Sequence, residues 1–251
     1  MAAFGSAAAY DGFMGRYSVP LAPQFAAFAR IQEHMRAVDV GAGTGALTSE
    51  LVRLGAEVAA AEPDEAFVDA LRRRFPSADV QVAVAEALPW ANGSFDAAVS
   101  QLVVAFMRDA RAGVLEMRRV VRRGGVVALC MWDRDGMQML GALQRAREAL
   151  GALDPATEAG MRHRTREELE ALFDDGFEHK TTELLVVDAG YADFADFWDA
   201  LRGGANQSGR WADSLTGSAL QDAQAAVFRE LGAPSGAFTL RAEAWAVAGR
   251  T

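Results

Sequence analysis

Short apolar segments alternate with segments of helical period along the first half of this 251-residue chain. Strands that are buried on both faces appear as nearly continuous apolar runs, and such runs predict five strands. They are expected at about 36–40, 57–61, 80–84, 95–100 and 126–132. Between them, apolar residues spaced by three or four positions predict helices near 45–54, 64–74 and 109–121, with Asp64 and Asp109 as N-caps of the second and third. This alternation is typical of an α/β fold, a mostly parallel sheet with helices on both faces.

The second half of the chain continues this pattern less regularly. A helix is expected over 137–150, and a capping box at Thr165–Glu168 predicts another that extends to Phe173. Apolar and β-branched residues predict strands over 181–188 and 238–247.

A helical insertion is predicted between the last two strands, at 190–232. Aromatic residues recur at helical spacing in its first part, 191–201, and a second capping-box pattern at Ser218 predicts a further helix. Such an insertion either covers a binding pocket or only completes the core, and the sequence leaves both open. Ahead of the first strand, residues 18–32 predict a helix within an N-terminal helical segment, 1–35.

One connection between a strand and a helix carries the strongest chemical signal. The strand at 36–40 runs into Gly41-Ala42-Gly43-Thr44-Gly45, and the next strand ends at Glu62, 21 residues after Gly41. Glycines permit left-handed backbone angles and a close approach to a ligand, and the helix that follows begins with free N–H groups. A carboxylate at the end of the second strand can accept hydrogen bonds from both hydroxyls of a ribose. The unit therefore predicts a site for an adenosine-containing cofactor of the nicotinamide, flavin or S-adenosylmethionine type.

Further motifs follow in order along the chain and separate these cofactor classes. They are Val38–Gly45, Glu62-Pro63, Ala85–Trp90, Gly93–Asp96, Ser100–Leu102, Glu116–Val120 and Gly124–Val127. With them, the sequence resembles the class I S-adenosylmethionine-dependent methyltransferases. Within this class it is similar to the small-molecule branch related to the quinone-biosynthesis enzymes, of the methyltransferase type 11 kind. The resemblance covers about 10–132.

This resemblance implies a fold and a domain organisation. It implies a Rossmann-like sheet of seven mostly parallel strands whose last strand runs antiparallel, with the helical insertion between the final two strands. We expect one methyltransferase domain over 1–251, with its cofactor-binding core at 36–132.

The resemblance also implies how the motifs meet the cofactor. The turn would face the methionine part and the ribose, Asp39 would orient the methionine amino group, and Arg16 suits its carboxylate. Pro63 would line the adenine, and Glu86 would read it, although Arg16 and Glu86 also fit ordinary surface roles. The predicted cofactor-binding set is Arg16, Asp39, Gly41, Ala42, Gly43, Thr44, Gly45, Glu62, Pro63, Ala85, Glu86, Ser100, Gln101 and Leu102.

The acceptor side is less defined, because methyl transfer from a sulfonium mainly needs positioning of donor and acceptor. No catalytic residue is identified. Tyr17 and His163 are candidates, and Ala105 stands where relatives often carry histidine. The candidate acceptor-side residues, each of which also fits a structural role, are Tyr10, Tyr17, Trp132 and Asp133.

Composition narrows the class of function. A formal net charge of −9 argues against a broad nucleic-acid surface, and a single lysine, Lys180, disfavours Schiff-base chemistry. Three histidines and one cysteine, Cys130, show no ligand spacing, so no metal is expected. No apolar run approaches the roughly 18 residues of a membrane span, and no basic residue precedes Arg16 as in a secretory leader. We therefore expect a cytoplasmic protein with no membrane partner.

Three functions remain open at this point. The first is S-adenosylmethionine-dependent methyl transfer to a small-molecule acceptor by in-line displacement, with S-adenosylhomocysteine as product, by a monomer or homodimer. The second is a methyltransferase-like protein that binds the cofactor or a metabolite without catalysis. The third is a nicotinamide-dependent oxidoreductase, which is disfavoured because no Tyr-x-x-x-Lys pair is present.

Overall fold

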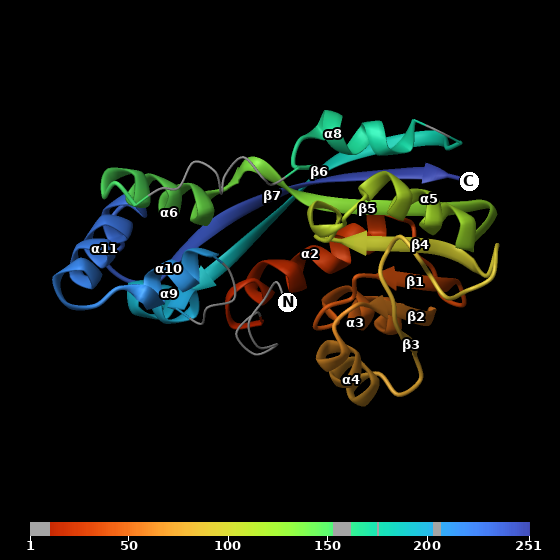
Figure 1. Ribbon diagram of the computed structural model, residues 1–251, viewed down its shortest axis with the longest axis horizontal. Helices are drawn as coiled ribbons and strands as arrows, with labels where there is room; N and C mark the ends of the chain where they lie inside the picture. The colour runs from red at the N-terminus through yellow and green to blue at the C-terminus, as the bar shows by residue number, and fades with distance from the viewer. Residues whose placement is uncertain (1–10, 153–161, 175, 203–206) are drawn as a thin grey trace. The chain divides into compact units, whose positions relative to one another are not determined.

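A computed structural model describes residues 11–152, 162–174, 176–202 and 207–251, which fall into two compact units (Figure 1). The larger unit comprises 18–134, 162–185 and 243–251, and the smaller unit comprises the described residues of 1–17, 135–161 and 186–242. Four elements have residues in both units, namely α2 (Gly15–Phe28), β5 (Val121–Met137), β6 (Glu178–Tyr191) and β7 (Phe238–Arg250). The expectation of a single domain over 1–251 stays a prediction.

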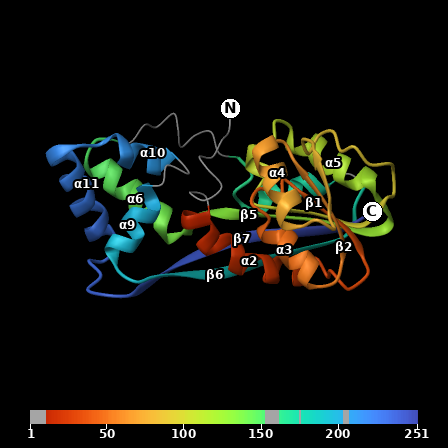
Figure 2. The same cartoon turned by 90° about the horizontal axis from the view of Figure 1, so that it is seen from below.

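Seven strands form one sheet in the order β3-β2-β1-β4-β5-β7-β6 (Figure 1). Figure 2 shows the same ribbon from below. They are β1 (Arg36–Val40), β2 (Glu57–Glu62), β3 (Asp79–Val82), β4 (Phe95–Gln101), β5 (Val121–Met137), β6 (Glu178–Tyr191) and β7 (Phe238–Arg250). The first five pair in parallel, and β7 lies antiparallel between β5 and β6. Where β5 begins and β7 ends, Gly124 N–H donates to Thr251 O at 2.9 Å. The predicted Rossmann-like class, with an antiparallel last strand, is confirmed.

Helices flank both faces of the strands in the larger unit. Its helices are α3 (Ala46–Arg53), α4 (Glu65–Arg74), α5 (Ala110–Val120) and α8 (Arg166–Glu170), with short 3₁₀ turns at Val104–Phe106 and Ala171–Phe173. Successive residues of β2 point to opposite faces: Ala59 shares a core cluster with Met117 of α5, and Ala60 shares another with Leu71 of α4. Burial on both faces explains the continuous apolar runs of these strands.

The predicted helix starts of the larger unit are confirmed. Asp64 and Asp109 each accept a hydrogen bond from a backbone N–H in the first turn of α4 and α5, at 2.9 and 3.0 Å. Thr165 and Glu168 form both bonds of the capping box that opens α8. These side chains satisfy backbone donors that a helix otherwise leaves free, so a short local pattern was sufficient to locate them.

Two other helix boundaries differ from the prediction. Helix α2 (Gly15–Phe28) begins and ends earlier than the expected 18–32, and it contains two prolines, Pro20 and Pro23. It ends because Arg30 adopts φ +56° and the next N–H bonds back five residues, a Schellman arrangement. The capping box expected at Ser218 is wrong, because α11 (Gly217–Glu230) includes Ser218 in its first turn, and its N-cap, Thr216, makes no side-chain bond.

The smaller unit contains the predicted helical insertion. Its helices are α6 (Gln138–Ala149), α9 (Phe194–Arg202), α10 (Gln207–Ser214) and α11, and the last three lie between β6 and β7 in the chain. The aromatic stripe of α9 packs internally, since the rings of Phe194 and Phe228 lie 5.1 Å apart at 76°. Arg145 of α6 pairs with Glu230 of α11 at 2.7 Å. The ring contact favours a core role for the stripe.

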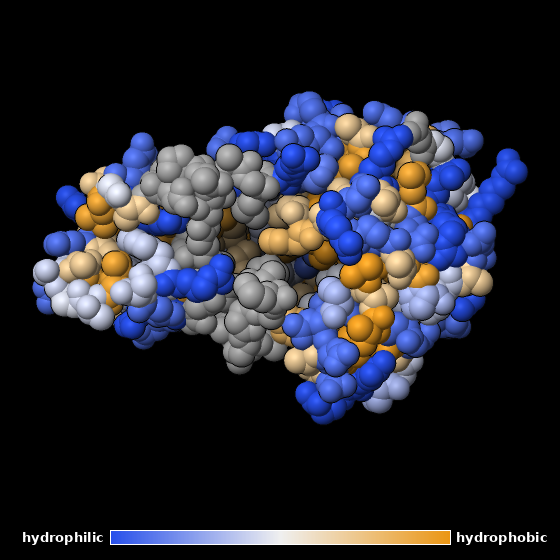
Figure 3. Space-filling model, in the orientation of Figure 1, coloured by the Kyte–Doolittle hydropathy of each residue, from blue (hydrophilic) through white to orange (hydrophobic). Residues whose placement is uncertain are grey.

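The described surface carries scattered apolar residues. On the face drawn in Figure 3, hydrophobic residues are interspersed with hydrophilic ones. The larger exposed apolar side chains are Val19, Val52, Val82, Val84, Phe106, Leu115 and Leu150. In the described ranges, no helix has both the length and the apolar character that crossing a bilayer requires.

Candidate functional site

The glycine turn lies in the larger unit, between the carboxyl end of β1 and the start of α3. Gly41, Gly43 and Gly45 have φ values of +78°, +54° and +88°. A Cβ on Gly41 would lie 2.6 Å from Val103, and one on Gly45 would lie 2.6 Å from the ring of Phe75. A Cβ on Gly43 would meet no described atom within 4 Å. Two of the glycines are therefore required by packing, and the middle one borders open space.

Glu62 ends β2 directly beside this turn. Its Oε2 accepts a hydrogen bond from Gly43 N–H at 2.9 Å, and its Oε1 accepts one from Asp64 N–H at 3.1 Å. The residue is 7% exposed, and burial raises the pKa of its carboxyl while the two backbone bonds oppose this rise. A carboxylate has about four acceptor positions, so both oxygens retain capacity for ligand hydroxyls. The arrangement fits the ribose of an adenosine cofactor.

A second carboxyl group, that of Asp39, lies beneath the turn. It is 1% exposed and accepts a hydrogen bond from Thr48 Oγ1 at 2.7 Å. Burial raises the pKa of Asp39 to about 7, opposed by its bonds to Thr48 and reinforced by the charge of Glu62. A cation bound nearby would favour the carboxylate, because opposite charges stabilise the ionised form.

Thr48 is a site residue that the sequence analysis missed. It belongs to the first turn of α3, nine residues after Asp39, and its side chain is fully buried. The available signal was a hydroxyl in the first turn of the helix that follows the glycines. That signal is weak, because threonine also occurs in helices for many other reasons.

The end of β4 lies at the same edge of the sheet as the end of β1, since the two strands pair in parallel. The strand order reverses between them, and in open α/β sheets ligands bind at this point. Ser100 Oγ donates to the carbonyl of Val40, the last residue of β1, at 2.8 Å. Gln101 Nε2 donates to the carbonyl of Ser18 in α2 at 3.0 Å. Leu102 adopts φ +64°, which non-glycine residues seldom do. The structure thus brings this predicted segment to the edge that carries the turn.

The segment that follows β3 lies next to the end of β2. Ala83 N–H donates to the carbonyl of Glu62 at 3.2 Å. Ala85 is 8% exposed and packs in the core cluster that contains α5. The Glu86 carboxylate accepts a hydrogen bond from the N–H of Asp109, the N-cap of α5, at 3.0 Å. Pro63 is exposed. The side chain of Glu86 therefore already holds α5, and its contact with adenine stays a prediction.

Two predicted residues belong to the smaller unit. Arg16 makes a bidentate pair with Asp196, with N–O distances of 2.5 and 2.9 Å. The Tyr17 hydroxyl lies 3.1 Å from that of Tyr191, and burial raises the pKa of Tyr17, so the phenol stays neutral near pH 7. This does not favour Tyr17 as a general base. The proposed contact of Arg16 with a carboxylate stays a prediction, and Tyr10 lies outside the described residues.

The remaining candidates lie in the larger unit: Trp132 and Asp133 in the later part of β5, and the catalytic candidate His163 in the segment ahead of α8. Trp132 is 5% exposed, and Asp133 accepts a hydrogen bond from Trp245 Nε1 at 2.8 Å. The segment that contains His163 is bound to this strand, because Arg134 N–H donates to the carbonyl of Arg164 at 2.8 Å. His163 is half-buried at φ +60°, and its Nδ1 has no partner among the described residues.

A family model described as a methyltransferase domain matches residues 38–129. These residues contain the glycine turn, Glu62 and the end of β4. This part of the chain is a class I methyltransferase domain. The more specific resemblance to the quinone-biosynthesis branch stays a prediction.

Curated relatives of this methyltransferase domain include an uncharacterized methyltransferase of Mycobacterium tuberculosis (strain ATCC 25618 / H37Rv). It is 35% identical over 149 residues, which are 59% of this chain and 58% of that protein. The chain therefore spans somewhat more than half the length of this relative.

Solved structures with the same fold include a putative type II methyltransferase from Anaeromyxobacter dehalogenans, with a TM-score of 0.65 at 20% identity. That comparison covers 91% of this chain and 95% of the other. The cyclase SpnF has a TM-score of 0.56 at 19% identity and covers 93% of this chain and 81% of its own. At such identities these likenesses show the fold alone. Across the described ranges, no group of three or more His, Cys, Asp or Glu side chains is arranged to hold a metal ion.

Proposed function

We propose that the chain is an S-adenosylmethionine-dependent methyltransferase that acts on a small-molecule acceptor. The observation that carries this proposal is the bond from Gly43 N–H to the Glu62 carboxylate, inside the segment that matches the methyltransferase family. A carboxylate fixed at a glycine turn suits the ribose of an adenosine cofactor. The family match favours S-adenosylmethionine among such cofactors.

Each part of the site would have a positioning role. S-adenosylmethionine, when bound, supplies a methyl group on a cationic sulfur, and an acceptor displaces that sulfur in line. Glu62 would accept hydrogen bonds from the ribose hydroxyls, and the backbone of the turn would border the same ligand. Asp39 would place negative charge beneath the cationic end. Residues 100–102 would border the methyl group and help to exclude water.

Positioning accounts for much of the catalysis in this proposal. Alignment of two reactants can supply roughly 7–11 kcal/mol of a barrier in favourable cases. Because the donor carries its own leaving group, the reaction does not require a strong general base when the acceptor is already nucleophilic. This agrees with a site whose described side chains mainly hold and orient.

The first test is calorimetric titration with S-adenosylhomocysteine. Glu62→Ala should weaken binding by tenfold or more, since a hydrogen bond to a charged group contributes about 1.5–3 kcal/mol. Glu57→Gln is a matched control, because Glu57 begins the strand that Glu62 ends. The control should bind like the unmodified chain. Folded protein that binds neither S-adenosylmethionine nor its product would refute the proposal.

A second candidate function is cofactor or metabolite binding without methyl transfer. It is favoured by the occurrence of the same fold in the cyclase SpnF, since that fold does not by itself dictate methyl transfer. Incubation with methyl-labelled donor and a fractionated metabolite extract separates the two functions. Label transfer supports the enzyme, whereas tight binding without transfer to any fraction supports the second candidate.

A further inference from the structure

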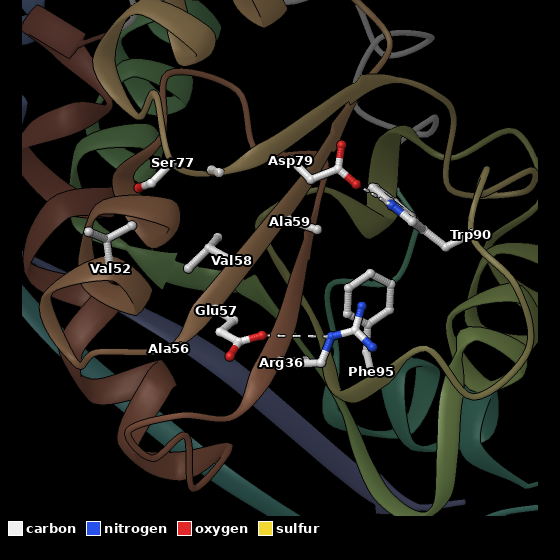
Figure 4. A pocket seen from close by; sticks show the side chains of 11 residues that line it. Arg36, Val52, Ala56, Glu57, Val58, Ala59, Ser77, Asp79, Trp90 and Phe95 are labelled. Atoms are coloured by element: carbon white, nitrogen blue, oxygen red, sulfur yellow. Dashed lines mark hydrogen bonds and ion pairs between the residues drawn. The ribbon is translucent and has the colours of Figure 1, made fainter.

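The larger unit contains a hollow of about 410 Å³ at the amino-terminal ends of its strands (Figure 4). It exists because of the strand register: β3 begins at Asp79, opposite Ala59, whereas β2 begins two residues earlier, at Glu57. The first residues of β2 therefore extend past the start of β3. The glycine turn lies at the opposite end of β1, about 13 Å away along a five-residue strand.

An aromatic corner forms one side of this hollow. The rings of Trp90 and Phe95 lie 5.3 Å apart and nearly perpendicular, at 86°. Trp90 is held in place because its Nε1 donates to Asp79 Oδ2 at 2.7 Å. In Figure 4, Ala59 lies between these residues and Val58, so a small side chain occupies the centre. The volume falls within the roughly 300–1,000 Å³ of small-molecule sites.

The charged groups around the hollow favour a cation. Two carboxylates, Asp79 and Glu57, and one guanidinium, Arg36, line it, which leaves one excess negative charge. Arg36 lies over the Phe95 ring at 5.6 Å, and its distance to Glu57 is 3.9 Å. The corner thus already accommodates a cation on one of its two rings. An anion would meet both carboxylates.

Asp79 retains the capacity to bind such a cation. Its two oxygens accept one hydrogen bond each, from Trp90 and from Gln81 Nε2 at 2.5 Å. A carboxylate has about four acceptor positions, so further donors can be bound. A cation near an indole face gains attraction from the ring as well as from the carboxylate.

We propose that this hollow binds a small organic cation, with its ammonium group against the Asp79 carboxylate and beside the face of the Trp90 ring, and a compact apolar body over Ala59. The site is separate from the cofactor site and does not depend on the function proposed above. Its lining combines the three features such a ligand needs: an aromatic face, a carboxylate and an apolar floor. A neutral ligand would lose the charge attraction, and an anionic one would be repelled.

The test uses three probes that share one ring and differ in charge: 2-phenylethylammonium, 2-phenylethanol and phenylacetate. Binding to the full ¹⁵N-labelled chain is followed through the indole N–H signal of Trp90, which Trp90→Phe identifies among the five tryptophans. The ammonium probe should shift this signal saturably. The alcohol should bind about three- to fivefold more weakly, as the loss of an exposed charge contact predicts, and phenylacetate should not bind.

Two variants locate the charge that the probe recognises. Asp79→Asn keeps an acceptor for Trp90 Nε1 and should reduce the affinity of the ammonium probe to that of the alcohol. Asp69→Asn removes an exposed carboxylate of α4 that does not line the hollow, and it should change nothing. Saturation with S-adenosylhomocysteine should leave the ammonium affinity unchanged.

Three results would overturn the proposal. They are equal affinity for all three probes, an ammonium affinity that survives in Asp79→Asn, and the absence of any Trp90 shift up to the solubility limit. Matching thermal unfolding of the two Asp variants and the unmodified chain shows that a loss of binding is not a loss of fold.

Discussion

Replacement of Asp39 by asparagine tests the electrostatics of the site directly. The carboxyl group is 1% exposed, and burial raises its pKa from the ordinary 3.8 to about 7. Between these two pH values the folded chain holds a proton that the unfolded chain has released. The free energy of unfolding therefore falls as pH rises through this range, and the lost stability is not recovered above pH 7. Asparagine does not titrate, so the variant avoids this loss.

The size of the effect follows from the same values. At about 1.4 kcal/mol per pH unit, the full range amounts to about 4 kcal/mol as an upper figure. The sequence pI is about 4.9, so solubility favours measurements above about pH 5.5. From there to pH 7, the variant should gain about 2 kcal/mol relative to the unmodified chain. Above pH 7 the difference should become constant.

Urea unfolding of the cofactor-free protein at a series of pH values measures this difference. Asp96→Asn is the matched control. A backbone N–H and two arginines lower the pKa of Asp96, so its carboxyl is ionised in both states over the measured range. Its variant should show a difference that does not depend on pH. The reasoning would be refuted if the stability difference between Asp39→Asn and the unmodified chain were also independent of pH. It would be refuted too if that difference moved in favour of the unmodified chain as pH rises.

Three further predictions follow from other contacts. Gly45→Ala should destabilise the fold by about 2–4 kcal/mol, because residue 45 has φ +88° and the new methyl group would lie 2.6 Å from the ring of Phe75. Gly43→Ala should cost only about 1 kcal/mol, because a Cβ there meets open space and only the backbone is strained. Equal losses in thermal unfolding would contradict this. Thr48→Val should cost about 1–2 kcal/mol by urea unfolding and move the pH-dependent loss attributed to Asp39 to higher pH; an unchanged profile would mean that the hydroxyl does not stabilise the carboxylate. Tyr17→Phe should cost about 1 kcal/mol equally at neutral and mildly alkaline pH, because burial raises the pKa of the phenol; a cost that varies with pH would show that the phenol ionises.

The most predictable features were those whose signal lies within a few residues. The caps at Asp64 and Asp109 were found because one side chain satisfies backbone N–H groups two or three positions later. The glycine turn was found because Gly41 and Gly45 need backbone angles that other residues avoid. Glu62 was found because it ends the strand that follows.

Features that depend on distant partners were missed or misplaced. The fifth strand was expected at 126–132 but extends over Val121–Met137, through polar residues and three glycines that alone do not predict a strand. Pairing of Val121 with Phe95 and hydrogen bonds to the end of β7 hold this start in the sheet. The pairing of Arg16 with Asp196, 180 residues away, was also missed, while the predicted contact of Arg16 with a cofactor carboxylate stays a prediction.

The sequence alone determined the alternation of strands and helices, the glycine turn and its acidic partner, because each depends on backbone geometry and burial that neighbouring residues encode. Tertiary structure decided the pKa values, hydrogen bonds and cavities of these elements. It buries Asp39 against Thr48 and thereby moves its titration toward neutrality, it bonds Glu62 to Gly43, and it offsets β2 from β3 to leave a hollow. These properties depend on desolvation and on strand register, and both arise only when segments that are distant in the chain pack together.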